Sequence, residues 1–179
     1  MTDVSRRGVF PGSFNPLTVA HLEIAHIARE THTLHEVVLV VSSVALDKPS
    51  PPGPSLGERI ELIRADLAGY DWLRIEQSNK QLIADLAEGF DVVIMGADKW
   101  EQLRDPRYYE SEDAMYDALR RLPVVAVAPR DGFAVNGADT LDTSPASRSV
   151  SSTDARAGDR TLMAPHAAKH WTHTNESGP

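Results

Sequence analysis

The sequence predicts an α/β protein with a single Rossmann-like, doubly wound parallel sheet of five or six strands and a helical C-terminal segment. Short apolar runs alternate with amphipathic helical stretches, which is the element order of a parallel sheet. The 179 residues suffice for one compact domain with a sizeable core. Hydrophobic residues make up 41% and charged residues 25% of the chain, the mix of an ordinary globular protein.

The first half of the chain supplies three strands and two helices. Residues 37–41 are a Val- and Leu-rich run, which is typical of a strand buried on both faces. Residues 47–54 are Pro-rich and predict a loop, because Pro cannot join a central ladder. Ser55 and Glu58 have the spacing of a capping box and open a helix. We expect strands at 7–10, 37–41 and 72–75 and helices at 18 to about 30 and at 55–67.

The second half continues the alternation. A second capping-box spacing at Ser78–Gln81 predicts a helix over Leu82–Leu86. Residues 132–149 are rich in Ala, Ser, Thr and Asp and predict an irregular loop. We further expect strands at 91–95 and 124–128, a helix at 111–122, one domain over residues 1–172 and a flexible tail over 173–179.

Charge and composition exclude several functions. The net charge is −8, with 26 acidic against 18 basic residues, which disfavours binding along a nucleic-acid backbone. No cysteine is present, so disulfides, thiolate metal sites and Cys nucleophiles are excluded. No apolar run approaches the roughly 18–20 residues of a membrane span, and no secretory-type stretch precedes the first motif. We expect a cytoplasmic protein without a membrane partner, and homo-oligomer formation is left open.

A loop-helix motif follows the first strand, from Gly12 to His21. A Gly- and Pro-containing loop before a helix N-terminus is an anion site, because free N–H groups and the helix dipole face the loop. Thr18 and His21 are three apart and share a face of the first turn. His21 could donate an N–H to phosphoryl oxygens and help neutralise charge on a leaving group. Alternatively, Thr18 only caps the helix and His21 packs against its first turn.

The whole string resembles the nucleotidyltransferase superfamily, whose pattern is Gly-x-Phe-x-Pro followed by Thr/His-x-x-His. It is especially similar to nicotinate/nicotinamide mononucleotide adenylyltransferases, although many members have Gly where this chain has Ala20. The resemblance implies catalytic roles for Thr18 and His21. It also implies a nucleotide-binding loop formed by Gly12, Ser13, Phe14 and Asn15.

Two further motifs follow. Val150–Arg156 contains three hydroxyl residues and then Asp and Arg, which predicts a helix start suited to phosphate. It resembles the Ser-Ser-Thr-x-x-Arg element of the superfamily, which implies that Arg156 and the hydroxyl residues Ser151, Ser152 and Thr153 bind the ATP β- and γ-phosphates. The Gly96-Ala-Asp98 string resembles the Gly-x-Asp of mononucleotide adenylyltransferases, which implies that Asp98 binds ribose hydroxyls. The alternatives are an ordinary N-cap with a solvated Arg156, and Asp98 as the N-cap of the next helix.

Other positions have weaker support. Lys48 resembles a family lysine that contacts phosphates, and could equally be a solvated loop residue. Arg59 and Arg130 could lie near the site or form surface pairs. The family stacks one aromatic ring on the pyridine, and the candidates here are Trp100, Tyr108 and Tyr109, each of which could be a core or surface residue. Leu162–Pro165 resembles a C-terminal family segment, and the resemblance runs from about residue 8 to 171.

No metal held by the protein is expected. The histidines at 166, 170 and 173 lack a neighbouring carboxylate or Cys, and Mg²⁺ is expected to arrive bound to ATP. The resemblance implies transfer of AMP from ATP to nicotinate or nicotinamide mononucleotide, with release of pyrophosphate. The alternatives are adenylyl transfer to another phosphorylated acceptor, such as phosphopantetheine, and a nucleotide-binding module that has lost catalysis.

Overall fold

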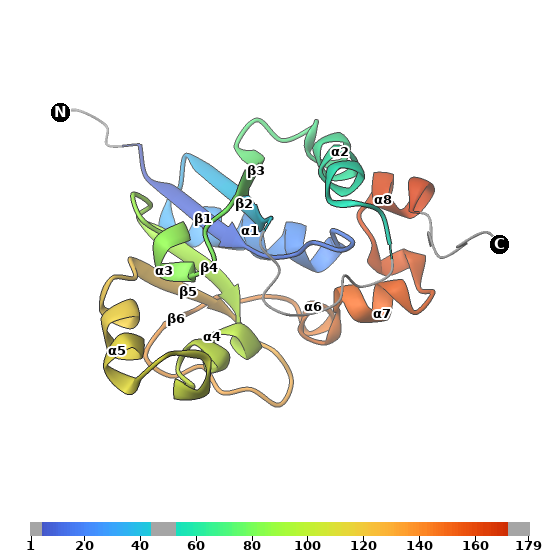
Figure 1. Ribbon diagram of the computed structural model, residues 1–179. Coiled ribbons are helices and arrows are strands. Elements are labelled where there is room, and N and C mark those ends of the chain that lie inside the picture. Colours follow the sequence, from blue (N-terminus) through green and yellow to red (C-terminus); the bar gives the residue numbers. More distant parts are fainter. Residues whose placement is uncertain (1–4, 44–52, 172–179) are drawn as a thin grey trace.

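Six strands form one sheet in which every neighbouring pair is parallel (Figure 1). The computed structural model describes residues 5–43 and 53–171. The strand order is β3-β2-β1-β4-β5-β6, so β1 lies in the middle of the sheet. This confirms the predicted doubly wound α/β class. The strands are β1 (Arg7–Pro11), β2 (Glu36–Ser42), β3 (Leu73–Ser78), β4 (Val92–Gly96), β5 (Val124–Ala128) and β6 (Asp139–Thr140).

Helices cover both faces of the sheet because the central strands are apolar on both faces. In β2, Val37 and Leu39 point into one core cluster and Val38 points into the other. The first cluster is closed by α1 (Val19–His32), α2 (Leu56–Leu67) and α8 (Pro165–His170). The second is closed by α3 (Ile83–Leu86), α4 (Ala97–Leu103) and α5 (Glu112–Arg120).

The C-terminal segment is held by hydrogen bonds to the residues that precede α1 and to α2. Met163 forms a β-bridge with Thr18, and the Ala164 N–H donates to the Leu17 carbonyl at 2.9 Å. The Asp66 carboxylate on α2 accepts the first free N–H groups of α8, from His166 at 2.6 Å and Ala167 at 3.0 Å. Figure 1 shows α8 beside α2 and, below them, α6 (Pro145–Ser149) and α7 (Ser152–Arg156).

The predicted capping box at Ser78–Gln81 is wrong. Strand β3 continues to Ser78, which pairs in register with Ser42 at the end of β2. The Ser78 hydroxyl accepts the Lys80 N–H at 3.1 Å, and α3 begins after Leu82 without a side-chain cap. The ladder with β2 therefore overrides the local capping signal. The capping box of Ser55 and Glu58, in contrast, is confirmed.

The expectation of an irregular loop over residues 132–149 is also wrong in part. This segment contains β6, which pairs with β5, and α6, whose N-cap Ser144 is followed by Pro145. Strand β6 has two exposed residues, too few to produce a period in the sequence. The Ser-Pro start of α6 was a readable helix signal.

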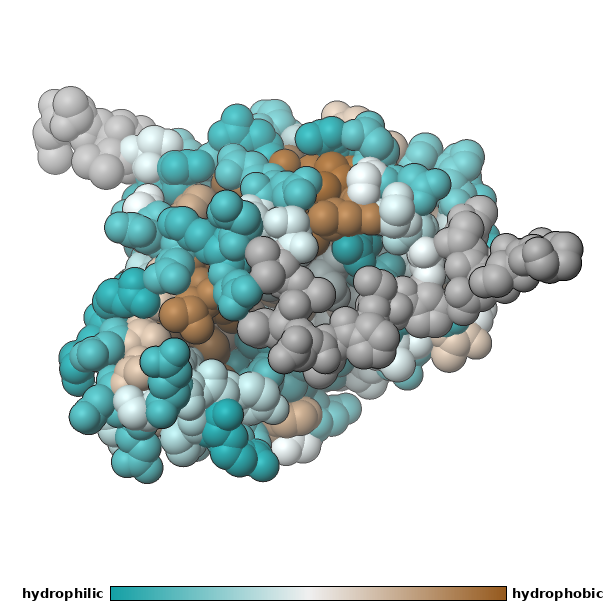
Figure 2. Space-filling view, in the orientation of Figure 1, coloured by the Kyte–Doolittle hydropathy of each residue, from teal (hydrophilic) through white to brown (hydrophobic). Residues whose placement is uncertain are grey.

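The surface carries no large apolar face in the view of Figure 2, which is mostly hydrophilic with small separate hydrophobic areas. Within residues 5–43 and 53–171, the large hydrophobic residues that are exposed are scattered over several elements: Val19, Tyr70, Leu82, Tyr108, Tyr116, Val124 and Phe133.

Candidate active site

The strand order reverses between β1 and β4, and the chain leaves these strands toward opposite faces of the sheet. In open α/β sheets a crevice forms at such a switch point, at the carboxyl ends of the strands. The loop from Gly12 to Thr18 follows β1, and Gly96–Asp98 follows β4. The first and third motifs of the sequence therefore border the same crevice.

Close packing explains the glycine and the aromatic ring of the first motif. The Phe14 ring is buried and packs edge-on against Phe10 and His21, with centroid distances of 5.4 and 5.0 Å. A Cβ atom on Gly12 would lie 2.8 Å from this ring. Phe14 has a φ of 42°, and the following Asn15–Pro16 peptide bond is cis, a feature the sequence did not indicate. Phe14 is therefore a buried support for the loop, and Ser13 is its exposed residue.

Thr18 and His21 form a capping box at the start of α1. The Thr18 hydroxyl accepts the His21 N–H at 3.3 Å, and the Thr18 N–H donates to His21 Nδ1 at 3.1 Å. Since Nδ1 accepts this bond, a neutral ring carries its proton on Nε2. Thr18 therefore does cap the helix, as the alternative interpretation of this motif expected. It also orients His21 and leaves its Nε2–H as the free donor.

His21 is neutral at pH 7. Burial and, to a smaller extent, the positive charge of Arg130 together lower the pKa of His21 to about 4. The ring can therefore donate a hydrogen bond, but it supplies no positive charge. Among the described residues of the crevice, positive charge is carried by Arg130 and Arg156.

The second motif meets the first across 141 residues of sequence. Ser151 caps α7, and the Ser152 hydroxyl donates to the Pro16 carbonyl at 2.9 Å. The Arg156 guanidinium donates to the Asn15 carbonyl and, at 3.3 Å, to the Thr153 hydroxyl. The two motifs are therefore parts of one site.

The third motif is joined to the second by Arg130, which follows β5. One guanidinium nitrogen lies 3.7 Å from an Asp98 carboxylate oxygen, and another donates to the Val150 carbonyl at 3.2 Å. A Cβ atom on Gly96 would lie 2.6 Å from Asp98 Oδ1, so glycine leaves room for this carboxylate. Gly96 itself is the N-cap of α4, so the expectation of Asp98 as N-cap is wrong; Asp98 is in the first turn.

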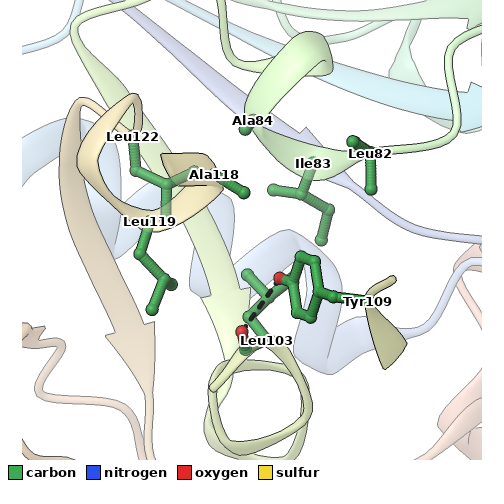
Figure 3. A pocket seen from close by; sticks show the side chains of 8 residues that line it. All are labelled: Leu82, Ile83, Ala84, Leu103, Tyr109, Ala118, Leu119 and Leu122. Atoms are coloured by element: carbon green, nitrogen blue, oxygen red, sulfur yellow. Dashed lines mark hydrogen bonds between the residues drawn. The ribbon is translucent and has the colours of Figure 1, made fainter. Parts of the chain in front are cut away.

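Two of the three candidate stacking rings are engaged elsewhere. Trp100 is 7% exposed, its indole N–H donates to the Asn136 carbonyl at 2.9 Å, and the Arg104 guanidinium covers its ring at 5.0 Å. The Tyr109 hydroxyl donates to the Leu103 carbonyl at 2.9 Å, and its ring lines a small apolar pocket between α3, α4 and α5 (Figure 3). Tyr108 is 58% exposed. We assign none of them to the crevice.

Glu23 is a supporting residue that the sequence did not indicate. Its carboxylate accepts the Ser144 N–H at 2.6 Å and the Ser144 hydroxyl at 3.0 Å, and it also accepts the Ser147 hydroxyl. Burial opposes ionisation of Glu23, but the hydrogen bonds from Ser147 and Ser144 lower its pKa overall. Glu23 thus ties α6, which precedes the second motif, to the helix that carries His21. No local pattern could show this, because its partners are more than 120 residues away.

Lys48 and His173 lie outside the described residues and remain predictions. Among residues 5–43 and 53–171, no three His, Asp or Glu side chains are grouped as metal ligands. The His166 and His170 rings lie against each other, with centroids 4.3 Å apart. In the same ranges, no helix has the length and apolar character needed to cross a bilayer.

A model of the cytidylyltransferase-like family matches residues 9–158. The chain belongs to this family. It is therefore a member of the nucleotidyltransferase superfamily, which the resemblance of the two terminal motifs had implied.

Individual relatives carry two different names. A protein of Gloeobacter violaceus named probable nicotinate-nucleotide adenylyltransferase is 38% identical over 36% of this chain and 31% of its own length. One of Bacteroides thetaiotaomicron with the same name is 28% identical over 73% of this chain and 68% of its own. A protein of Arthrobacter named phosphopantetheine adenylyltransferase is 31% identical over 76% of this chain and 81% of its own.

Proposed function

We propose that this chain transfers AMP from ATP to nicotinate or nicotinamide mononucleotide, releasing pyrophosphate and forming a pyridine dinucleotide. The observation that carries adenylyl transfer is the junction of the two motifs, where Arg156 and Ser152 bond to the carbonyls of Asn15 and Pro16. Relatives named as adenylyltransferases of both kinds support the same reaction type. The pyridine acceptor rests on Gly96 and Asp98, whose string resembles that of mononucleotide adenylyltransferases.

The chemistry is an in-line displacement at the α-phosphorus of ATP. A phosphate oxygen of the acceptor forms a bond to the α-phosphorus. At the same time the bond between the α-phosphorus and the oxygen that bridges it to the β-phosphate breaks, and pyrophosphate leaves. The attacking phosphate is already ionised near neutral pH, so the reaction needs no general base. Catalysis then depends on positioning and on stabilising the charge that builds on the leaving group. Mg²⁺ enters as part of the MgATP substrate.

The described residues divide these tasks. The His21 Nε2–H would donate to a phosphoryl oxygen without adding charge, because the ring is neutral. Arg156 would supply positive charge, together with free N–H groups at the helix start capped by Ser151. Asp98, paired with Arg130, would accept hydrogen bonds from ribose hydroxyls. Lys48 is retained as a further phosphate contact on the resemblance alone.

A second candidate acceptor is phosphopantetheine. It is favoured by the Arthrobacter relative, which matches over 81% of its own length. The two acceptors differ in the group that must be recognised, a flat pyridine ring against a flexible amide chain. The crevice described above contains no ring assigned to stacking, so the acceptor is decided by assay.

The deciding experiment measures pyrophosphate release from ATP with nicotinate mononucleotide, nicotinamide mononucleotide and phosphopantetheine supplied separately. We expect release with one of the pyridine mononucleotides and formation of the matching dinucleotide. Release with phosphopantetheine alone would replace the pyridine acceptor by that substrate. ATP binding without release under any acceptor would identify a nucleotide-binding module and contradict the proposed transfer.

A further inference from the structure

The last tryptophan of the chain, Trp171, lies outside the three motifs and is buried in the same core as the first of them. Its side chain is 2% exposed and belongs to the core cluster that contains Phe14 and Leu17. Trp171 follows α8 directly, and its N–H donates to the Ala167 carbonyl at 2.8 Å. The indole is therefore carried by the end of α8.

Helix α8 is held at both ends, which fixes where this indole lies. At its start, the Asp66 carboxylate accepts two backbone N–H groups. At its end, the Arg160 guanidinium donates to the carbonyls of Ala168 at 2.8 Å and Trp171 at 3.0 Å. The last carbonyls of a helix have no partner within the helix, and an arginine side chain can satisfy them. Short as it is, α8 thus gives Trp171 a fixed position.

Gly53 marks the place where this indole approaches the first motif. A Cβ atom on Gly53 would lie 2.9 Å from Cζ2 of Trp171 and 3.0 Å from the side-chain oxygen of Asn15. Both groups therefore border the space in which a side chain at position 53 would begin. Gly53 also has a φ of 139°, a conformation that residues with a side chain rarely adopt. Glycine is thus required for space and for backbone conformation where Trp171 and Asn15 come together.

Asn15 is the residue of the first motif on which the second motif depends. Its carbonyl accepts the Arg156 guanidinium, and the carbonyl of the next residue, Pro16, accepts the Ser152 hydroxyl at 2.9 Å. The Asn15 side chain is 1% exposed, and its oxygen is buried without a hydrogen-bond partner in the described part of the chain. Because no hydrogen bond holds this oxygen, its position depends on the packing around it, to which Trp171 contributes.

We propose that Trp171 is a positioning residue for adenylyl transfer, which acts through Asn15. Its indole keeps the Asn15 side chain in place, and Asn15 in turn presents the carbonyl that Arg156 binds. The inference rests on the proposed function and extends it to a residue outside all three motifs. A displacement of about 1 Å far from the reacting atoms can cost on the order of a hundredfold in rate, so looser packing at Asn15 should be visible in kinetics.

The test compares the variants W171F and W72F of the full chain. W171F keeps an aromatic ring in the core but removes the outer ring of the indole, whose Cζ2 and Cη2 atoms lie nearest to the Cβ position of Gly53. W72F is the matched control, because Trp72 lies at the amino end of β3, away from the crevice, and packs with Tyr70 and Arg29. We expect kcat/KM for ATP to fall on the order of tenfold in W171F and to be unchanged in W72F. A W171F variant as active as W72F would overturn the proposal.

Hydrogen exchange separates positioning from a general loss of stability. A global loss of stability raises exchange throughout the core, whereas looser packing at one place raises it locally. In W171F we expect faster exchange of the Thr18 amide, which donates to His21 Nδ1, and of the Ala155 amide, which donates to the Ser151 carbonyl. Amides of β4 and β5 give the global reference. Acceleration by the same factor in these strands would make Trp171 a structural residue only and overturn the proposal.

Gly53→Ala carries the same test if W171F does not fold. The added Cβ enters the space bordered by Trp171 and Asn15, so it disturbs their packing without removing the indole. Gly89→Ala is its control, because Gly89 also has a positive φ, of 83°, and nothing lies within 4 Å of its Cβ. We expect kcat/KM to fall on the order of tenfold in Gly53→Ala, whereas Gly89→Ala should lose stability only. Equal kcat/KM in the two variants would overturn the proposal.

The two proposals can fail separately, because the exchange experiment needs neither ATP nor an acceptor. Local acceleration in W171F, in a chain that transfers no AMP, would contradict only the proposed reaction. A chain that transfers AMP, and whose W171F variant transfers it equally well, would contradict only the role of Trp171.

Discussion

The two motifs that meet in the crevice are held in different ways. In the first, Phe14, Asn15 and Thr18 are each 1% exposed, and the loop is braced by β2 and by its own capping box. In the second, Thr153 and Asp154 are exposed, and the segment is anchored by two bonds to carbonyls of the first motif. The first motif is thus a buried frame, and the second takes its position from that frame. Damage to the frame should therefore affect both, whereas loosening the second should leave the frame intact.

The largest effect is expected from replacing the imidazole of His21 while keeping its cap. Gln is a normal residue at the third position of a capping box, so His21→Gln should preserve the start of α1 and remove the Nε2–H donor. We expect kcat to fall about 10²- to 10³-fold, with a smaller change in the KM for ATP. Steady-state kinetics on the accepted substrate pair measure this. His26→Ala, an exposed histidine on the same helix, is the control, and an unchanged kcat in His21→Gln would remove His21 from the mechanism.

The frame itself is broken by Gly12→Ala. The new Cβ would lie 2.8 Å from the buried Phe14 ring, so the loop has to shift. We expect the free energy of unfolding to fall by about 1–3 kcal/mol and activity to fall with it. Denaturant unfolding followed by circular dichroism provides the value. Gly57→Ala is the matched control, since nothing lies within 4 Å of its Cβ and helical Ala is favoured over Gly; it should be neutral or slightly stabilising. Equal stability of the two variants would show that the loop is not tightly packed.

The depressed pKa of His21 makes the frame sensitive to acid. The unfolded chain binds a proton on this ring below about pH 6.5, whereas the folded chain does so only near pH 4. The stability contribution is therefore complete above pH 6.5 and is lost as the pH falls through 4. Melting temperatures measured from pH 7.5 to 4 should drop more steeply for the parent than for His21→Gln. Parallel curves would mean that His21 titrates normally in the folded protein.

The smallest effect is expected from Glu23→Gln, which loosens the second motif and spares the frame. The variant keeps the size of the side chain but weakens the bonds from Ser144 and Ser147. We expect a loss of about 1 kcal/mol in stability, because the carboxylate is only partly buried. Hydrogen exchange should become faster in α6 and α7 and stay unchanged in the amides of the Gly12–Thr18 loop. Glu30→Gln, an exposed neighbour on α1, should change neither, and protection lost equally in both motifs would contradict the comparison.

The parts that could be predicted from sequence are those whose signal is local. The buried run of β2, the cap of α2 by Ser55 and Glu58, and the strand at 124–128 were all readable, because a few adjacent residues decide them. The errors came where a partner far along the chain intervened. Strand β3 extends through the residues of a capping pattern because it pairs with β2 along its whole length. Strand β6, only two residues long, forms because it pairs with β5.

The sequence alone determined the element order, the residue types of the three motifs and hence the family. Only the tertiary structure decided that Arg156 meets the Asn15 carbonyl and that Trp100 and Tyr109 are engaged away from the crevice. The reason is physical. Backbone capping and periodicity act over a few residues, whereas burial, ring orientation and unpaired charge depend on which distant segments the folded sheet brings into contact.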